Sequence, residues 1–298
     1  MKKSRRESRR KPDKEEVGTD EYGREILELR ESEIREIEKR ATINAVVVHE
    51  VVRQEGEDEL NRHPRALMWS GLAAGLSMGF SFLASVLLNA YLPGSDSWHP
   101  LVYSLGYATG FLIVVLGRQQ LFTENTLTAV LPLLHRHNFS LILSLLRLWG
   151  IVLVTNLVGG LIFAVVLAKA GVAGPGFEQS LMEIAQRGVN GLQFGFGSTL
   201  LGAVFAGWLI ALMVWLLPVA ESARVAIVLI ITYLVGLGNF AHIIAGSTET
   251  IYAVLTGLLS PLGYVKDFFA PALIGNVLGG VVLVAVLNHA QAMIGRRH

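Results

Sequence analysis

The chain has 298 residues, and 52% of them are hydrophobic. Its net charge of +1 hides an uneven distribution, since residues 1–65 carry 16 of its 25 basic and 17 of its 24 acidic residues. The other 233 residues hold 9 basic and 7 acidic ones, too few for a soluble domain, and the absence of cysteine excludes disulfides, thiolate metal sites and a cysteine nucleophile. From residue 66 onward, the composition is that of a membrane domain.

The first 65 residues are expected to form two cytoplasmic regions. Residues 1–22 are rich in Lys and Arg, which predicts a disordered tail that is either simply solvated or attracted to anionic lipid headgroups. Residues 23–65 are expected to form an amphipathic helical segment. Its apolar residues recur every seven positions, at Leu27, Ile34, Ala41 and Val48.

Six segments after residue 65 are long and apolar enough to cross a bilayer, which takes about 20 apolar residues in a helix. They lie at 66–92, 101–134, 141–169, 191–217, 224–258 and 268–290. This predicts an all-α transmembrane domain over residues 66–290, followed by a short cytoplasmic tail at 291–298. The loops at 92–100 and 170–190 carry few basic residues, so both termini are expected on the opposite, cytoplasmic side.

One short motif occurs twice in the transmembrane domain. Asn156-Leu-Val-Gly-Gly160 and Asn276-Val-Leu-Gly-Gly280 each open a long apolar run, 120 residues apart. The second copy lies three segments after the first, and an odd number of crossings turns the second half over in the bilayer. The pattern therefore predicts an inverted three-helix repeat, an arrangement that places the working site near the middle of the membrane.

The second and fifth segments are interrupted at matching places. Polar residues and glycine interrupt the apolar run at 117–126 in one and at 236–249 in the other. A charged side chain that faces lipid costs about 2.5–3.5 kcal/mol. Irregular backbone at membrane depth is tolerated where it is buried or lines a cavity, so we expect two broken helices at the site. The alternative is that both stretches are interfacial loops between eight short crossings, but this leaves 226–235 too short to span.

Four motifs in order resemble the formate/nitrite transporter family, and the long charged N-terminus resembles its YfdC-like branch. They are Leu121-Phe122-Thr123, Asn156–Gly160, His242-Ile-Ile-Ala245 and Pro271–Gly280. A fifth is weaker, because Ala206-Gly207-Trp208 stands where the family often has Asn before Trp. The resemblance covers residues 66–290.

This resemblance implies a homopentamer in the inner (plasma) membrane. Each protomer would be aquaporin-like, with its own pore for small monovalent anions or weak acids such as formate, nitrite or hydrosulfide, sometimes moving with a proton. The expected partners are other copies of the chain, membrane lipid and the small substrate. No enzyme activity, cofactor, metal or nucleic acid is expected.

The resemblance also assigns residues to the pore. Thr123 supplies a hydroxyl to the permeant anion, and Leu121 and Phe122 line the constriction beside it. The apolar gate positions fall on three further residues, which are Tyr107, Phe111 and Val235. An apolar constriction strips water from an ion, so an anion crosses only where donors replace its water or a proton neutralises it.

His242 is the expected central residue, since histidine can lend a proton near neutral pH. The family usually has Glu before this His and Asn after the Ala, whereas this chain has Ala241 and Gly246, which puts proton coupling in doubt. Asn239 lies within one helical turn and is expected to orient the ring instead. Arg187 is the candidate for the basic residue that draws anions into the outer vestibule.

Two other function classes remain open. A channel for small neutral solutes, like an aquaporin, suits a neutral His242, although the duplicated Asn-Pro-Ala boxes of that family are absent. An intramembrane serine protease would pair Ser198 with His242, but it leaves the repeated motif and the two interruptions unexplained.

Overall fold

The computed structural model describes residues 17–19, 25–27, 44–92, 97–136, 138–169 and 175–294. The chain divides into two units, Met1–Ile43 and Asn44–His298. In the first unit, β1 (Val17–Thr19) and β2 (Glu25–Leu27) pair antiparallel.

These strands differ from the disordered tail and the helix expected at those positions. β-Branched Val17, Thr19 and Ile26 favour extended backbone. The remainder of the 1–22 tail, and of the expected helix up to residue 43, lies outside the described residues.

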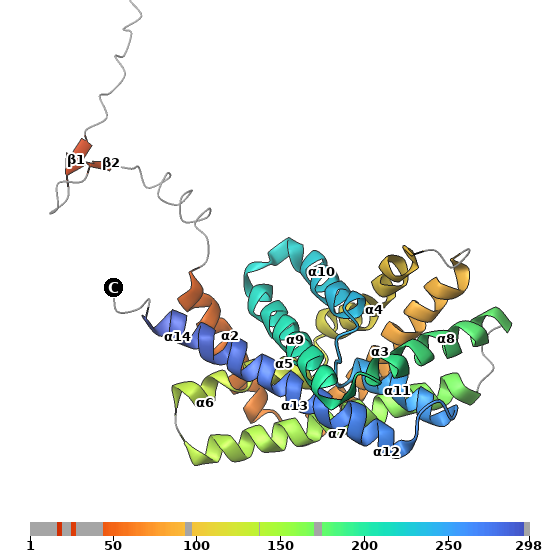
Figure 1. Cartoon of the computed structure of the whole chain (residues 1–298). Helices are drawn as coiled ribbons and strands as arrows, with labels where there is room; N and C mark the ends of the chain where they lie inside the picture. The colour runs from red at the N-terminus through yellow and green to blue at the C-terminus, as the bar shows by residue number, and fades with distance from the viewer. Residues whose placement is uncertain are drawn as a thin grey trace, which may run out of the picture. The chain divides into compact units, whose positions relative to one another are not determined.

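The regular elements described in the second unit are all helical (Figure 1). The α-helices are α2 (Ala45–Asn61), α3 (Pro64–Tyr91), α4 (His99–Leu116), α5 (Phe122–Thr128), α6 (Leu131–His135), α7 (Phe139–Lys169), α8 (Pro175–Leu192), α9 (Gly195–Leu216), α10 (Arg224–Leu237), α11 (Ala245–Leu255), α12 (Pro261–Gly263), α13 (Ala270–Leu278) and α14 (Leu287–Ile294). Short 3-10 turns follow α9, at η1 (Leu217–Val219) and η2 (Glu221–Ala223). Two π-helical stretches, η3 (Tyr264–Phe269) and η4 (Gly279–Val286), join α12, α13 and α14 into one continuous helical run.

Five helices in the described part of the chain are long and apolar enough to cross a membrane. They are Pro64–Tyr91, His99–Leu116, Phe139–Lys169, Gly195–Val219 and Pro261–Ala292. The apolar helix α10 is shorter, with 14 residues. The segment expected at 101–134 is divided among α4, α5 and α6, and the segment expected at 224–258 is divided between α10 and α11.

Close packing of the long helices depends on glycine. Helix α3 packs against α4 and α7, and α9 packs against α13 and η4. A Cβ at Gly159 would lie 2.6 Å from the Leu72 carbonyl oxygen, and one at Gly279 would lie 2.6 Å from the Trp208 nitrogen. A side chain at either position would overlap the backbone of the neighbouring helix, so glycine allows the two helix backbones to approach this closely.

Helix α8 lies where the sequence analysis expects a loop. Phe177, Leu181, Ile184 and Ala185 are buried in it, and it packs against α3 and α11. These residues recur at three- and four-residue spacing, as one face of an amphipathic helix does. The segment is too polar to read as a membrane crossing, so its helical period was the only signal for it.

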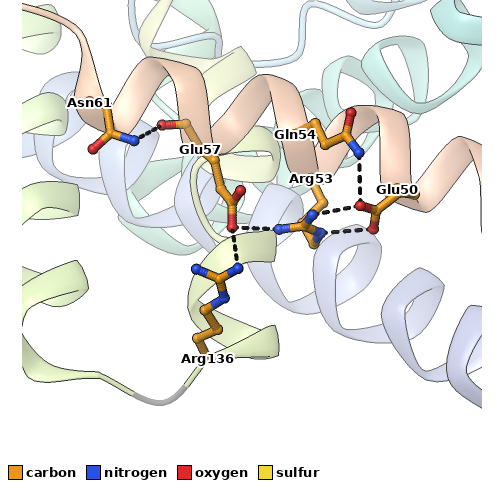
Figure 2. Close-up of polar contacts among 6 residues, drawn as sticks. All are labelled: Glu50, Arg53, Gln54, Glu57, Asn61 and Arg136. Carbon is orange, nitrogen blue, oxygen red and sulfur yellow. Dashed lines mark hydrogen bonds and ion pairs between the residues drawn. The ribbon is translucent and has the colours of Figure 1, made fainter.

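Helix α2 is anchored to the transmembrane domain by apolar and polar contacts. Val52 joins the main hydrophobic core. Arg147 on α7 donates a hydrogen bond to the Leu60 carbonyl at 2.6 Å. Figure 2 shows Arg53 bonded to both Glu50 and Glu57, and Arg136 reaching Glu57 from outside the helix.

A histidine pair joins α2 to α14. The His49 Nε2 lies 2.9 Å from the His289 Nδ1, and the His49 ring lies edge-on to Trp215. Burial, together with the neighbouring His289, lowers the pKa of His49 from 6.5 to about 4. The folded protein therefore keeps His49 neutral at pH values where the unfolded chain would protonate it.

We predict that acidification destabilises the fold through His49. Between its ordinary pKa of 6.5 and its folded value of about 4, the unfolded state binds the proton more tightly, so stability falls as the pH drops through that window. Between about pH 7 and about pH 5 we expect a loss of about 1 kcal/mol, less than the full linkage value because water and salt screen the site. Thermal unfolding in detergent should show this loss in the wild type and a smaller one in His49→Gln. Equal losses in both would contradict the assignment.

Candidate functional site

Asn156 on α7 holds the backbone that follows α4. Its side chain is fully buried. Its Oδ1 accepts from the Phe122 N–H at 2.9 Å, and its Nδ2 donates to the carbonyls of Gln120 (2.9 Å) and Gly71 (2.8 Å). One side-chain amide thus provides hydrogen-bond partners for the backbone of the non-helical segment between α4 and α5 and connects that segment to α3.

Asn276 on α13 makes the same set of bonds to the segment between α10 and α11. Its Oδ1 accepts from the Ile243 N–H at 2.8 Å. Its Nδ2 donates to the carbonyls of Ala241 (2.9 Å) and Ala203 (2.8 Å). The two asparagines of the repeated motif therefore make equivalent hydrogen bonds to the two segments between helices, 117–121 and 238–244, which are called the helix gaps below.

Both gaps begin with the same backbone turn. Arg118 and Asn239 have φ of 49° and 48°, the left-handed conformation that usually belongs to glycine at a helix C-terminus. The next N–H groups reach back to the carbonyls of Val114 and Val235, both at 3.0 Å. A non-glycine residue in this conformation is uncommon, and here it occurs at both gaps.

The second glycine of each motif packs against the short helix beyond the other gap. A Cβ at Gly160 would lie 2.7 Å from the Thr248 Oγ1 on α11. A Cβ at Gly280 would overlap Thr126 on α5. These contacts bring α5 and α11 toward the same place from opposite halves of the sequence.

His242 and Thr123 meet at this place. Both side chains are fully buried. The His242 Nε2 lies 2.8 Å from the Thr123 Oγ1, and the His242 Nδ1 accepts from the Ala245 N–H at 3.2 Å. A ring nitrogen that accepts carries no proton, so Nε2 carries the ring proton and donates it to Thr123. The Thr123 hydroxyl hydrogen is then available to another acceptor.

An apolar layer surrounds this pair. The ring of Phe111 lies edge-on to His242, with 5.0 Å between centroids, and Tyr107 lies 5.4 Å beyond Phe111. Leu121 and Val235 are both fully buried. The Phe122 ring lies edge-on to Trp149 on α7, with 5.8 Å between centroids, and it lines neither of the cavities described below.

Two cavities lie in this region, and His242 but not Thr123 lines one of them. A cavity of about 410 Å³ is lined by His242, and one of about 230 Å³ is lined by Val235 and Arg187. Some residues line both: Tyr107, Gly188, Asn239, Phe240 and Glu249. Among the described residues, no group of three or more His, Asp or Glu side chains is placed to hold a metal ion.

Arg187 lies on α8 at the wall of the smaller cavity. Its guanidinium lies 5.0 Å from the centre of the Tyr103 ring, a cation–π distance. Its Nη1 is 3.4 Å from the Asn89 Oδ1. Asn89 also donates to the Glu183 carboxylate, so Arg187 holds a positive charge at the cavity with Glu183 as its carboxylate neighbour.

The expected orienting role of Asn239 is not what the structure shows. Asn239 lies outside the helix, in the left-handed turn, and both His242 nitrogens bond to other groups. The Ala245 N–H orients the ring instead. Where the family's Asn would stand, a Cβ at Gly246 would lie 2.6 Å from the Phe268 Cζ, so an aromatic ring fills that space.

Glu249 is the site residue that the sequence analysis missed. It lines both cavities and follows His242 by seven residues. The available signal was its charge, because an ionisable residue within a membrane-depth segment marks a functional position by default.

We predict that replacing either gap-holding asparagine destabilises the protein strongly. Asn276→Ala would leave the buried Ile243 N–H and two carbonyls without partners, at about 1–3 kcal/mol for each unsatisfied group. Asn156→Ala should do the same. Thermal unfolding in detergent should show a large loss for both, and almost none for Asn61→Ala, whose bond to the Glu57 carbonyl is exposed. A wild-type melting curve for either buried variant would refute the proposed role.

Comparison with known proteins agrees with this geometry. The sequence pattern of the formate/nitrite transporter family matches residues 46–290. The chain is 39% identical over 254 residues to the Escherichia coli (strain K12) inner membrane protein YfdC, covering 85% of this chain and 81% of that protein. It is 25% identical to the Bacillus thuringiensis formate channel BtFdhC, covering 80% and 91%. A solved pentameric formate channel with formate bound shares the fold, with a TM-score of 0.65 at 19% identity, covering 77% and 98%.

The relatives are channels and transporters rather than enzymes, so the protease alternative is set aside. Ser198 does line the larger cavity, but His242 bonds to Thr123 and to the Ala245 N–H. With five described helices able to cross a membrane and a family match over most of its length, the chain is a multi-pass membrane protein that belongs to the formate/nitrite transporter family.

Proposed function

We propose that this protein is a channel or permease for small monovalent anions and their weak acids, of the formate and nitrite kind. One observation carries the proposal: a buried His242–Thr123 pair lies where two helix gaps meet, beside a cavity of about 410 Å³. The imidazole and hydroxyl of this pair offer the polar groups that a small anion or weak acid needs. Family membership supports transport of that class.

We further propose that residues 66–290 form an inverted repeat of two three-helix halves, an aquaporin-like arrangement. Helices α4 and α5 would be one broken helix, and α10 and α11 the corresponding one. The support is the matching set of bonds from Asn156 and Asn276 and the matching left-handed residues at the two gaps. In such repeats the substrate site lies at the midplane between the halves.

The chemistry of the pair suits an anion. Because His242 donates to Thr123, the Thr123 hydroxyl can donate to a negatively charged oxygen. Phe111, Leu121 and Val235 are buried around it and would remove the water shell of an ion, for which the hydroxyl compensates in part. Tyr107 would share the gate with Phe111, while Phe122 would stiffen the constriction from behind.

The approach to this pair would be guided by charge. Arg187 borders the smaller cavity and would attract anions toward it. Asn239 lines both cavities and offers an amide donor on the same path.

The proposal extends to the assembly. We propose a homopentamer in the plasma membrane, with lipid as the surrounding partner, both termini in the cytoplasm and one pore in each protomer. The solved pentameric formate channel with this fold supports it. Residues 1–65 and 291–298 would then lie in the cytoplasm.

A channel for neutral solutes is the second candidate. One observation favours it: the bonds of His242 leave the ring neutral, with no carboxylate on the preceding residue. A channel for anions and their weak acids takes up formate and nitrite, whereas a channel for neutral solutes takes up neutral solutes only. Uptake of both kinds of solute by the same liposomes therefore separates the two candidates.

We predict that the full chain in liposomes takes up formate and nitrite faster than protein-free vesicles do. Thr123→Val keeps the shape but removes the hydroxyl, and should lower uptake about tenfold, the equivalent of one hydrogen bond to a charged group. Thr123→Ser, which keeps the hydroxyl, should retain most of it. His242→Asn retains an N–H for Thr123 and should lose less than Thr123→Val. Absence of uptake by the wild type, with neutral solutes passing, would refute the anion function.

A further inference from the structure

A carboxylate lies on the wall that the two cavities share. Glu249 on α11 lines both of them. It makes no hydrogen bond or ion pair to any residue in the described ranges 17–19, 25–27, 44–92, 97–136, 138–169 and 175–294. An ionised carboxylate at membrane depth is costly without a partner, so its position calls for a chemical reason.

The surroundings of Glu249 do not neutralise it. Its nearest cationic neighbour along the cavity walls is Arg187 on α8, which is turned to the Tyr103 ring and to Asn89. Tyr103 and Tyr107 on α4 and His242 are the other titratable groups that line these cavities, and α3 contributes Ser81, Phe82 and Ser85. From η3, Phe268 lines the larger cavity. On the opposite face of α11, the Tyr264 hydroxyl pairs with Ser247.

The carboxylate is held close to the backbone of α8. A Cβ built on Gly188 would overlap the Glu249 Oε1, so the absence of a side chain at residue 188 makes room for it. Gly188 also lines both cavities. The carboxylate thus occupies a place that α8 leaves open for it, next to the path toward His242.

His242 is poorly arranged to lend a proton. Its Nδ1 accepts from the Ala245 N–H, and its single ring proton bonds to Thr123. A second proton on Nδ1 would face the Ala245 N–H and break that bond. If the permeant takes a proton from the protein, a group other than His242 is better placed to give it.

We propose that Glu249 is that proton donor, for the anion of a small weak acid; this inference rests on the transport function proposed above. The protonated carboxyl of Glu249 gives its hydrogen to an oxygen of the entering anion, which becomes a neutral acid, and Glu249 becomes a carboxylate. The neutral acid crosses the apolar layer at Phe111 without the cost of a bare charge. A hydronium ion from the cavity water then reprotonates Glu249, so one proton and one anion cross together.

The test is uptake of radiolabelled formate by liposomes that hold the full chain and an internal pH-sensitive dye. Between about pH 5 and about pH 8, wild-type uptake should rise as the external pH falls, with about one proton entering for each formate. Glu249→Gln keeps the shape without the ionisable proton. It should lower uptake at the acidic end about tenfold or more and flatten the pH profile. Protein-free vesicles supply the background, and Glu178→Gln, at an exposed site on α8, should behave as the wild type.

Two further variants keep the inference testable if Glu249→Gln fails to assemble. Glu249→Asp retains a carboxyl and should keep a pH-dependent, slower uptake. Gly188→Ala should push the carboxylate aside and shift the pH profile without altering any titratable group. A wild-type pH profile and proton ratio in Glu249→Gln, or in Gly188→Ala where Glu249→Gln does not assemble, would overturn the role of Glu249 while leaving the transport function intact. No formate uptake by the wild type would overturn the transport function and this inference together.

Discussion

The structure depends on two buried asparagines that hold the non-helical segments between α4 and α5 and between α10 and α11. Lipid offers no hydrogen bonds, so every backbone group within a membrane needs a partner within the protein. Asn156 supplies three bonds around one gap and Asn276 supplies three around the other. Without them the gaps would leave polar backbone unsatisfied, and the residues that the gaps carry would have no fixed position.

The gaps place chemistry where two halves of the chain meet. Thr123 follows the first gap and His242 lies at the end of the second, and they form one hydrogen-bonded pair. Gly160 and Gly280 let α11 and α5 approach the opposite halves. In each copy of the motif, the asparagine hydrogen-bonds to the backbone of a non-helical segment, and the second glycine allows a close contact with the short helix beyond the other segment. These two roles explain why both parts of the motif occur twice.

The charged side chains that line the two cavities lie apart from the His242–Thr123 pair. The central pair is neutral by its hydrogen bonds, and the surrounding layer is apolar. Arg187 and Glu249 lie at the cavity walls, one as a cation and one as a carboxyl that bonds to no residue in the described part of the chain. In the proposed transport cycle, this division would let an anion be attracted and neutralised before it meets the apolar layer.

The sequence by itself determined the transmembrane class, the repeated motif, the positions of the two interruptions and the family. These features can be predicted from the sequence because composition, spacing and periodicity depend only on the order of residues along the chain. The tertiary structure decided which groups meet: that His242 bonds to Thr123 and the Ala245 N–H rather than Asn239, that Phe122 turns to Trp149, and that Glu249 lies against Gly188. It also decided that residues 17–19 and 25–27 pair as strands and that 175–192 forms a helix. Most of these outcomes depend on contacts between residues that are distant in sequence. The others occur in short segments whose local conformational preference is too weak to select one structure.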